Sequence, residues 1–220
     1  MRHDLDVTTA PRAARESIPV PTFARDVPAA ATRRMVHRVP LLLTLLRAAL
    51  APVLIYLAIV FPSKVGFGIC LMAGFLSDVY DGIIARRLGI ATSSLRRLDS
   101  ITDTFFYLAA SFAAWHLYPH AILRRAIPIT ILILLETARY AFDWLKFRRE
   151  ASYHMWSSKV WGISLFVGFF SLLALGSDDV SLSVAIYLGI LADCEGLAIS
   201  ISLRRWTPDV PSLIHALRSA

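Results

Sequence analysis

Four aspartates are the residues of this sequence whose types and spacing best suit shared chemistry. They lie in the stretch "SDVYDGIIARRLGIATSSLRRLDSITD", residues 77–103. On a helix, Asp78 and Asp81 (i, i+3) share one face. Asp99 and Asp103 (i, i+4) share one face of the next helix in the same way. If a short connection makes these helices antiparallel, all four carboxylates point into one volume. Like charges so close together need cations.

Hard divalent ions are the cations that best suit such a group of carboxylates. Mg²⁺ binds a few carboxylates and leaves its remaining positions to water or substrate phosphate. Gly82, beside Asp81, removes a side chain where a ligand must approach the backbone closely. Arg86, one turn further on, can reach a phosphate. The stretch therefore predicts metal-assisted phosphate chemistry.

The segments that must position these acids are apolar runs suited to a lipid bilayer. The chain of 220 residues is 56% hydrophobic and 18% charged, and its mean hydropathy is +0.59. A helix needs roughly 20 apolar residues to cross about 30 Å of hydrocarbon. We predict an all-α integral membrane bundle of six transmembrane helices. The expected spans are residues 41–61, 65–84, 98–118, 126–145, 160–175 and 180–203.

The basic residues predict how the chain lies in the membrane. The net charge is +7, and the positive charge gathers at the ends of the apolar runs, so we expect no nucleic-acid partner. The positive-inside rule then places both termini and the aspartates on the cytoplasmic side of the cell (inner) membrane. The acidic loop "GSDDVS" suits the opposite side, whereas Arg124 and Arg125 break the rule.

The two ends of the chain are expected to lie outside the membrane domain. The first 40 residues hold five of the 11 prolines and seven arginines, with little apolar periodicity, so they cannot bury enough surface to fold alone. We predict a disordered basic cytoplasmic tail over residues 1–39, a membrane catalytic domain over 40–205 and a short cytoplasmic tail over 206–220.

The aspartate stretch resembles the motif of the CDP-alcohol phosphatidyltransferases, D-x-x-D-G-x-x-A-R-x(8)-G-x(3)-D-x(3)-D. Seven of its eight fixed positions agree, namely Asp78, Asp81, Gly82, Ala85, Arg86, Asp99 and Asp103. Leu95 replaces the second glycine. The start of the first apolar run is similar to the family's P-N-x-x-T-x-x-R segment, with Pro40, Thr44 and Arg47 present and Leu41 in the asparagine position. The family's six-helix core covers residues 41 to about 205 of this chain.

The resemblance implies an enzyme of phospholipid biosynthesis that moves a phosphatidyl group from CDP-diacylglycerol to a small polar alcohol and releases CMP. Similarity of residues 40–52 to bacterial phosphatidylglycerophosphate synthases favours glycerol 3-phosphate as the acceptor; inositol phosphate, serine or another alcohol stays open. Two Mg²⁺ (or Mn²⁺) ions are implied as cofactors. Family members are commonly homodimers, and the lipid bilayer is the remaining partner.

The resemblance also implies roles for single residues. By position, Asp78, Asp81 and Asp99 are metal ligands. Asp103 matches the aspartate proposed as general base, which also lies near the second metal. The implied nucleotide-binding residues are Gly82, Ala85, Arg86, Thr44 and Arg47. Arg139 and Lys159 are candidates for an acceptor phosphate.

Simpler roles exist for some of these basic residues. Arg47 can instead extend its guanidinium to the membrane interface. Glu136, three residues before Arg139, offers that arginine an intrahelical ion pair.

Other classes of protein could carry similar acids. A membrane prenyltransferase also binds a diphosphate through magnesium and aspartates, but it forms a larger bundle and lacks the linked Gly82, Ala85 and Arg86. A transporter would place its acids near the midplane rather than at one side. An inactive scaffold member of the family is the third alternative, and Leu95 and Leu41 motivate it.

Overall fold

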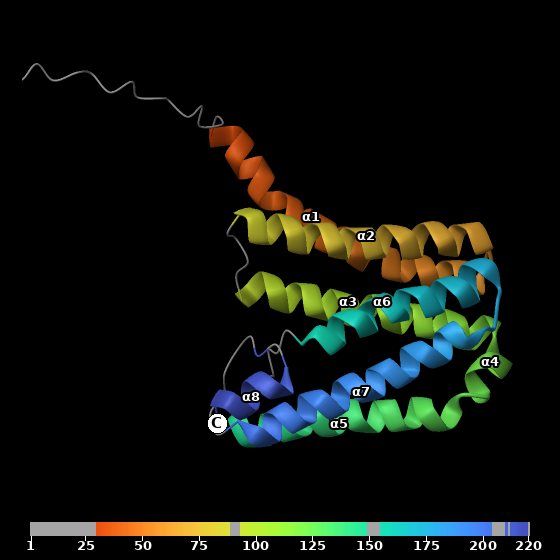
Figure 1. Ribbon diagram of the computed structural model, residues 1–220. Helices are drawn as coiled ribbons and strands as arrows, with labels where there is room; N and C mark the ends of the chain where they lie inside the picture. Colours follow the sequence, from red (N-terminus) through yellow and green to blue (C-terminus); the bar gives the residue numbers. More distant parts are fainter. Residues whose placement is uncertain (1–29, 89–92, 149–154, 204–209, 211, 220) are drawn as a thin grey trace, which may run out of the picture.

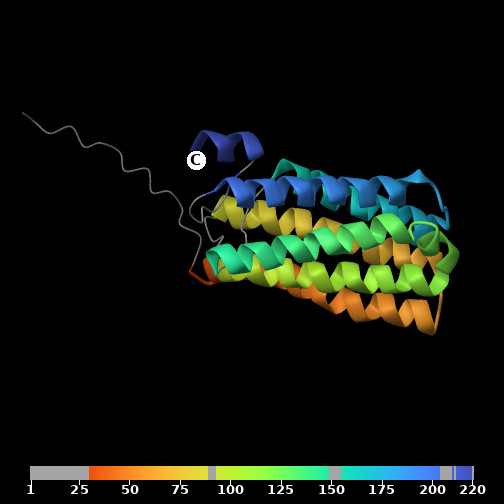
Figure 2. The ribbon, with the colours of Figure 1, turned by 90° about the horizontal axis from the view of Figure 1, so that it is seen from below.

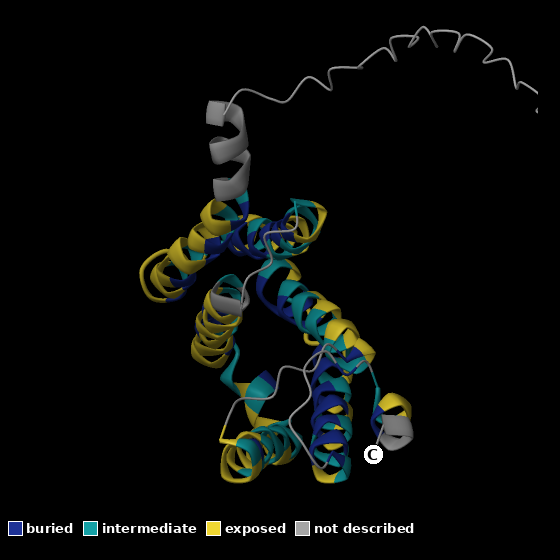
Figure 3. Ribbon diagram, turned by 90° about the vertical axis from the view of Figure 1, so that its left-hand side faces the viewer, coloured by how far each residue is buried: buried dark blue, intermediate teal, exposed yellow. Residues whose placement is uncertain are grey.

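The computed structural model describes residues 30–88, 93–148, 155–203, 210 and 212–219, all of which belong to helices or their connections. The helices are α1 (Ala30–Ile59), α2 (Lys64–Leu88), α3 (Ser93–Leu117), α4 (Pro119–Leu123), α5 (Ala126–Phe147), α6 (Trp156–Phe169), the π-helix η1 (Phe170–Leu175), α7 (Val180–Ser202) and α8 (Leu213–Ser219). The long helices run side by side in an elongated bundle (Figures 1 and 2). Its exposed residues lie mainly on the outer faces (Figure 3).

Four of the described helices are long and apolar enough to cross a membrane: Val39–Ile59, Lys64–Leu88, Trp156–Leu175 and Val180–Ser202. They contain all of the predicted spans 65–84 and 160–175 and most of 41–61 and 180–203. The predicted spans 98–118 and 126–145 form α3 and α5, which are also long. These two helices carry more polar and charged side chains, among them Glu136, Arg139 and Asp143. The structure confirms an all-α membrane bundle with four such spans among its described residues.

The two predicted tails are described only in part. Residues 1–29 lie outside the described residues, and α1 already begins at Ala30, before the predicted start of the first span. Its first turns point away from the bundle (Figure 1). At the other end, α8 lies within the predicted tail 206–220 and packs on α7 through Ala216 and Ile199.

Helix α1 packs against both α2 and α3 and so joins the two helices that carry the aspartates. Leu54 of α1, Leu71 of α2 and Phe106 of α3 are fully buried in one apolar core. Gly74 of α2 lies directly against the Phe106 ring, and a Cβ at this position would overlap it. The glycine allows α3 to reach α2 one turn before Asp78.

A second contact, at the far end of the bundle, involves the two arginines that break the positive-inside rule. Arg124 and Arg125 both form ion pairs with Asp178 in the acidic loop, at 2.6 Å for Arg125 Nη1 and Asp178 Oδ1. Arg125 Nη2 also donates to the backbone carbonyl of Asp179 at 2.9 Å. The loop therefore neutralises positive charge on its own side of the bundle.

Asp179 also begins α7 as its N-cap, because its Oδ1 accepts a hydrogen bond from Ser181 N at 2.8 Å. Hydrogen bonds from Ser181 and Ser171 lower the pKa of Asp179 to about 2.

Candidate active site

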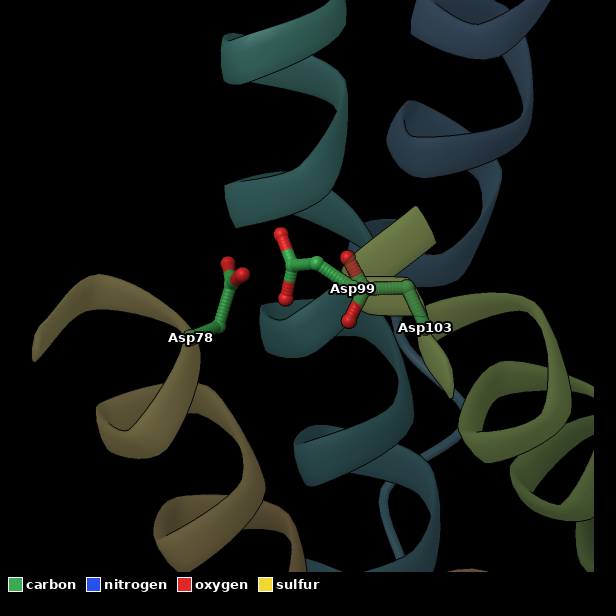
Figure 4. Close-up of side chains that lie close together, drawn as sticks. All are labelled: Asp78, Asp99 and Asp103. Atoms are coloured by element: carbon green, nitrogen blue, oxygen red, sulfur yellow. The ribbon is translucent and has the colours of Figure 1, made fainter. Parts of the chain in front are cut away.

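Three of the four aspartates converge on one point. Asp78 comes from α2, Asp99 and Asp103 come from α3, and their carboxylates point toward one another (Figure 4). One oxygen from each of the three lies within 4.8 Å of the others. Their side chains are 47%, 33% and 34% exposed, respectively, so water and a polar substrate can reach them.

Asp81 is the fourth acid and lies deeper in the helix packing. It is 4% exposed and is held by two residues of α1. Arg47 Nη2 lies 2.6 Å from Asp81 Oδ2, and Thr44 Oγ1 lies 3.4 Å from the same oxygen. Asp81 therefore stands outside the group of three whose oxygens converge.

Arg47 is the cation at the centre of these acids. The residue is 1% exposed, and its Nη1 lies 3.1 Å from Asp78 Oδ1 and 3.2 Å from Asp99 Oδ1. The same nitrogen contacts Asp103 Oδ1. With the Nη2 bond to Asp81, one guanidinium touches all four carboxylates. We call these five residues the aspartate cluster.

The aspartate cluster keeps an excess of negative charge, because one guanidinium faces four carboxylates. Oxygen ligands at this spacing, open to water on one side, suit a hard divalent ion. Arg47 Nη1 already contacts Asp78, Asp99 and Asp103. The donor set thus fits a metal, and the arginine nitrogen and a shared ion are alternatives at the same point.

Comparison with protein-family models decides what kind of protein carries this cluster. The model of the CDP-alcohol phosphatidyltransferases matches residues 37–194, which is more than half of the chain. The chain belongs to this family. The matched residues include the whole aspartate cluster. Comparisons with curated proteins and with solved structures found no match.

Family membership establishes the general chemistry. The protein is a membrane phosphatidyltransferase of phospholipid synthesis that acts on a CDP-alcohol and an alcohol substrate, and enzymes of this family typically use a divalent metal. Asp78, Asp99 and Asp103 converge closely enough to hold such a metal.

The remaining motif residues of this phosphatidyltransferase lie on α2 just beyond the aspartates. Arg86 is exposed, and its guanidinium folds back over Gly82, so a Cβ there would lie 3.2 Å from Arg86 Nη1. Ala85 is buried. The two departures from the motif lie on other helices: Leu95 is half-buried in the first turn of α3, and Leu41 is exposed on α1.

The basic residues considered for an acceptor phosphate lie apart from one another. Arg139 of α5 donates from Nε to Asp193 Oδ1 of α7 at 3.0 Å, so its ion-pair partner is Asp193 rather than the neighbouring Glu136. Lys159 is exposed near the start of α6, and its Nζ lies 4.5 Å from the centre of the Trp156 ring.

The contact between α5 and α7 contains buried charges that the sequence interpretation missed. Asp143 is 0% exposed and Asp193 is 2% exposed. We call Glu136, Arg139, Asp143 and Asp193 the α5–α7 seam. Gly196 of α7 makes room for it, because a Cβ there would lie 2.8 Å from Arg139 Cδ. The available signal was the presence of ionisable residues inside apolar runs, which are rare there and have partners.

Lys146, near the end of α5, makes a further polar contact with α7. Its Nζ donates to the backbone carbonyls of Ser200 and Ile201 at 2.8 and 3.0 Å. These carbonyls belong to the last turn of α7, where carbonyls commonly take partners from outside the helix. The lysine thus caps α7 from the neighbouring helix.

Proposed function

We propose that this phosphatidyltransferase transfers the phosphatidyl group of CDP-diacylglycerol to glycerol 3-phosphate and releases CMP. The observation that carries the proposal is the convergence of Asp78, Asp99 and Asp103 around the guanidinium of Arg47. The choice of acceptor rests on the similarity of residues 40–52 to bacterial phosphatidylglycerophosphate synthases.

In this proposal the aspartate cluster holds two Mg²⁺ or Mn²⁺ ions through Asp78, Asp81, Asp99 and Asp103. When bound, such ions neutralise charge on the diphosphate and on the departing CMP. Arg47 and Thr44 act as positioning residues, because both contact Asp81. Arg86, exposed beside Gly82, contacts the nucleotide phosphates, and Gly82 and Ala85 leave space for the nucleotide.

Asp103 is proposed as the general base. The acceptor hydroxyl attacks the phosphorus that carries the diacylglycerol, the bond from that phosphorus to the CMP oxygen breaks, and the hydroxyl proton passes to Asp103. An aspartate with a pKa near 4 is a weak base at neutral pH, so orientation of the hydroxyl supplies part of the activation. The partial exposure of Asp103, 34%, allows an acceptor to reach it.

For the acceptor phosphate we propose Lys159 rather than Arg139. The Arg139 guanidinium is engaged with Asp193 and half-buried in the α5–α7 seam. Lys159 is exposed, and its contact with Trp156 is a cation–π contact that an anionic ligand can displace.

We further propose that α3 and α5 also cross the membrane, which gives six spans, and that both termini and the active site face the cytoplasm. In this topology Asp99 and Asp103 of α3 lie in the half of the helix nearer the cytoplasm. Arg139 and Asp143 of α5 do so too, whereas Glu136 lies at the middle of α5. The pairing of Arg124 and Arg125 with Asp178 supports this topology, because it removes the free positive charge from the outer side.

An acceptor panel tests the proposed function. Purified protein is incubated with CDP-dioleoylglycerol, Mg²⁺ and either glycerol 3-phosphate, inositol phosphate or serine, while CMP release and the mass of the lipid product are followed. We expect CMP release and phosphatidylglycerophosphate with glycerol 3-phosphate alone. A different lipid product would contradict glycerol 3-phosphate as the acceptor but would still support phosphatidyl transfer from CDP-diacylglycerol. No CMP release with a broad panel of alcohols would contradict the proposal and favour the inactive scaffold.

A further inference from the structure

Tyr107 of α3 is a polar residue that has no role in the reaction described above. It follows Asp99 and Asp103 at intervals of four residues, so the three side chains share one face of α3. At 1.5 Å per residue, Tyr107 lies about 6 Å further along the helix than Asp103. The Asp78 carboxylate and the Arg47 guanidinium are near enough to act electrostatically on its hydroxyl. The tyrosine therefore lies one turn beyond the aspartate cluster, toward the middle of the bundle.

The hydroxyl of Tyr107 links α3 to the backbone of α6. It donates to the carbonyl oxygen of Gly162 at 3.5 Å, a long hydrogen bond that a nearer oxygen atom can replace. Gly162 lies on the same stripe of α6 as Phe166 and Phe169. Phe166 stacks on Phe75 of α2 with ring centroids 4.3 Å apart, and the Phe169 and Tyr107 ring centroids are 6.2 Å apart. Gly162 therefore belongs to the face of α6 that packs toward α2 and α3.

Open space lies beside Gly162. Among the described residues, a Cβ at this position would meet no atom of another helix within 4 Å. By contrast, a Cβ at Gly168 would lie 3.1 Å from Leu182 Cα, and one at Gly189 would lie 2.6 Å from Trp161 Nε1. Close helix packing thus explains Gly168 and Gly189 but not Gly162, although glycine is unfavourable inside a helix. The space beside Gly162 is what a ligand between α3 and α6 would need.

This space lies next to both groups that the proposed function assigns to the acceptor. Lys159 precedes Gly162 by three residues, and Asp103 precedes Tyr107 by four, which is about one turn in each case. Helices α3 and α6 contact each other and run in the same direction (Figure 1), so Lys159 and Asp103 lie on the same side of the Tyr107–Gly162 hydrogen bond. We propose that Tyr107 and Gly162 form the floor of the acceptor site and limit the size of the acceptor, which rests on the proposed function.

The residues beyond this floor are apolar. One turn further on, α3 carries Ala110, which is fully buried, and α6 carries Phe166, whose ring is stacked on α2. The hydroxyl groups of a polyol would find no partner in this layer, and burying them there unpaired is unfavourable. The depth left between the floor and the groups that hold the acceptor is one helical turn, about 5 Å. The three-carbon chain of glycerol 3-phosphate suits this depth better than the ring of inositol phosphate does.

Protection of a cysteine tests the floor without turnover. Gly162→Cys is combined with Cys194→Ser, because Cys194 is exposed whereas Cys70 is buried. The purified full-length protein, with Mg²⁺ and without donor lipid, is treated with a charged methanethiosulfonate reagent. Glycerol 3-phosphate at about ten times its dissociation constant should slow the modification about tenfold by occupancy. Val160→Cys in the same background is the control, because Val160 is exposed on the opposite side of α6 and should not be protected.

Acceptor kinetics test the size limit. Gly162→Ala adds a methyl group to the open space without a clash and favours the helix. Its KM for glycerol 3-phosphate should rise about tenfold while kcat is retained. Gly68→Ala, whose Cβ would lie 3.4 Å from Ala174 Cβ on the other side of α2, should keep both constants. Tyr107→Leu lowers the floor and should reduce the ratio of kcat/KM for glycerol 3-phosphate to that for inositol phosphate about tenfold.

The outcomes separate the floor from the reaction. Modification of Gly162→Cys that glycerol 3-phosphate does not slow, or an unchanged KM in Gly162→Ala, would overturn the floor even when CMP release by the wild type is normal. An unchanged acceptor ratio in Tyr107→Leu, or protection of Gly162→Cys by inositol phosphate as well, would overturn the size limit. Protection by glycerol 3-phosphate in a protein that forms no lipid product with any acceptor would overturn the proposed transfer while the floor stands.

Discussion

The aspartate cluster and the α5–α7 seam lie in the same half of the bundle, yet their acidic side chains differ in exposure and in ion-pair partners. In the cluster, three carboxylates converge within 4.8 Å and stay partly exposed. In the seam, Asp143 and Asp193 are fully buried, and Asp193 has Arg139 as its ion-pair partner. Among the described residues, only Asp78, Asp99 and Asp103 form a group that could share a metal ion.

This difference separates a binding site from a packing contact. Convergent carboxylates with an excess of negative charge repel one another, and the repulsion is relieved when a cation binds. A buried acid with its own arginine gains nothing from an added ion and loses much when its partner is removed. We therefore propose that the cluster binds ligands and that the seam holds α5 and α7 together.

Exchange of one acid in each region should give the largest difference. Asp103→Asn removes the proposed base and a metal ligand, so its rate of CMP release should fall by roughly 10²–10⁴-fold. Asp193→Asn, the matched change in the seam, should keep its turnover. Initial rates of CMP release are compared after size-exclusion chromatography confirms that both variants are folded. Equal losses of activity in the two variants would contradict the claim that the aspartate cluster, and not the seam, takes part in the reaction.

Removal of the central arginine should destabilise the metal-free protein strongly. Arg47→Met leaves four carboxylates without their shared cation, and the loss of one partner of a buried ion pair costs about 3–5 kcal/mol. In EDTA the variant should unfold at a lower temperature than the wild type, and added Mg²⁺ should raise its unfolding temperature by more than it raises that of the wild type. In EDTA the unfolding temperature of Arg47→Lys, which keeps the positive charge, should lie between those of the wild type and Arg47→Met. A variant as stable as the wild type in EDTA would contradict this role.

Breaking the pair in the seam should affect stability but not the response to metal. Asp193→Leu leaves Arg139 without its partner and should cost about 3 kcal/mol. The double variant Arg139→Met/Asp193→Leu should recover most of this loss, because neither charge then remains. Thermal unfolding is measured with EDTA and with Mg²⁺, and the Mg²⁺-induced shift should equal that of the wild type. Loss of that shift in Asp193→Leu would show that the seam takes part in metal binding.

The smallest effect is expected at Lys146. Lys146→Met removes the bonds to the last carbonyls of α7 and should lower the free energy of unfolding by about 1 kcal/mol. Lys64→Met is a suitable control, because Lys64 also donates to a backbone carbonyl, that of Leu175, but at the exposed opposite end. Denaturant unfolding of both variants measures the difference. A larger loss for Lys64→Met would contradict the capping role of Lys146.

Local periodicity explains how much of this structure could be predicted from the sequence. Spacings of three and four residues place Asp78 and Asp81, and likewise Asp99 and Asp103, on single helix faces without knowledge of the tertiary fold. The lengths of the apolar runs predict the long helices. Family resemblance suggested Arg47 as a nucleotide ligand, but its contact with all four acids depends on α1 packing against both α2 and α3, which spacing within one helix does not encode.

The ion pair in the α5–α7 seam also could not be predicted from spacing within one helix. Arg139 has Glu136 three residues away, and the local pattern favours that pair. The structure instead pairs Arg139 with Asp193, 54 positions along the chain. The start of α1 at Ala30 was also not evident, because its first turns lack the apolar periodicity from which spans are predicted.

Binding of Mn²⁺, followed by electron paramagnetic resonance, tests most directly that the aspartate cluster is the metal centre of this enzyme. The wild type, Asp99→Asn and Asp193→Asn are titrated at equal protein concentration, and the free-ion signal reports what remains unbound. The account predicts that the wild type and Asp193→Asn bind Mn²⁺ alike and that Asp99→Asn binds it far more weakly. Undiminished binding by Asp99→Asn, or loss of binding in Asp193→Asn, would contradict it.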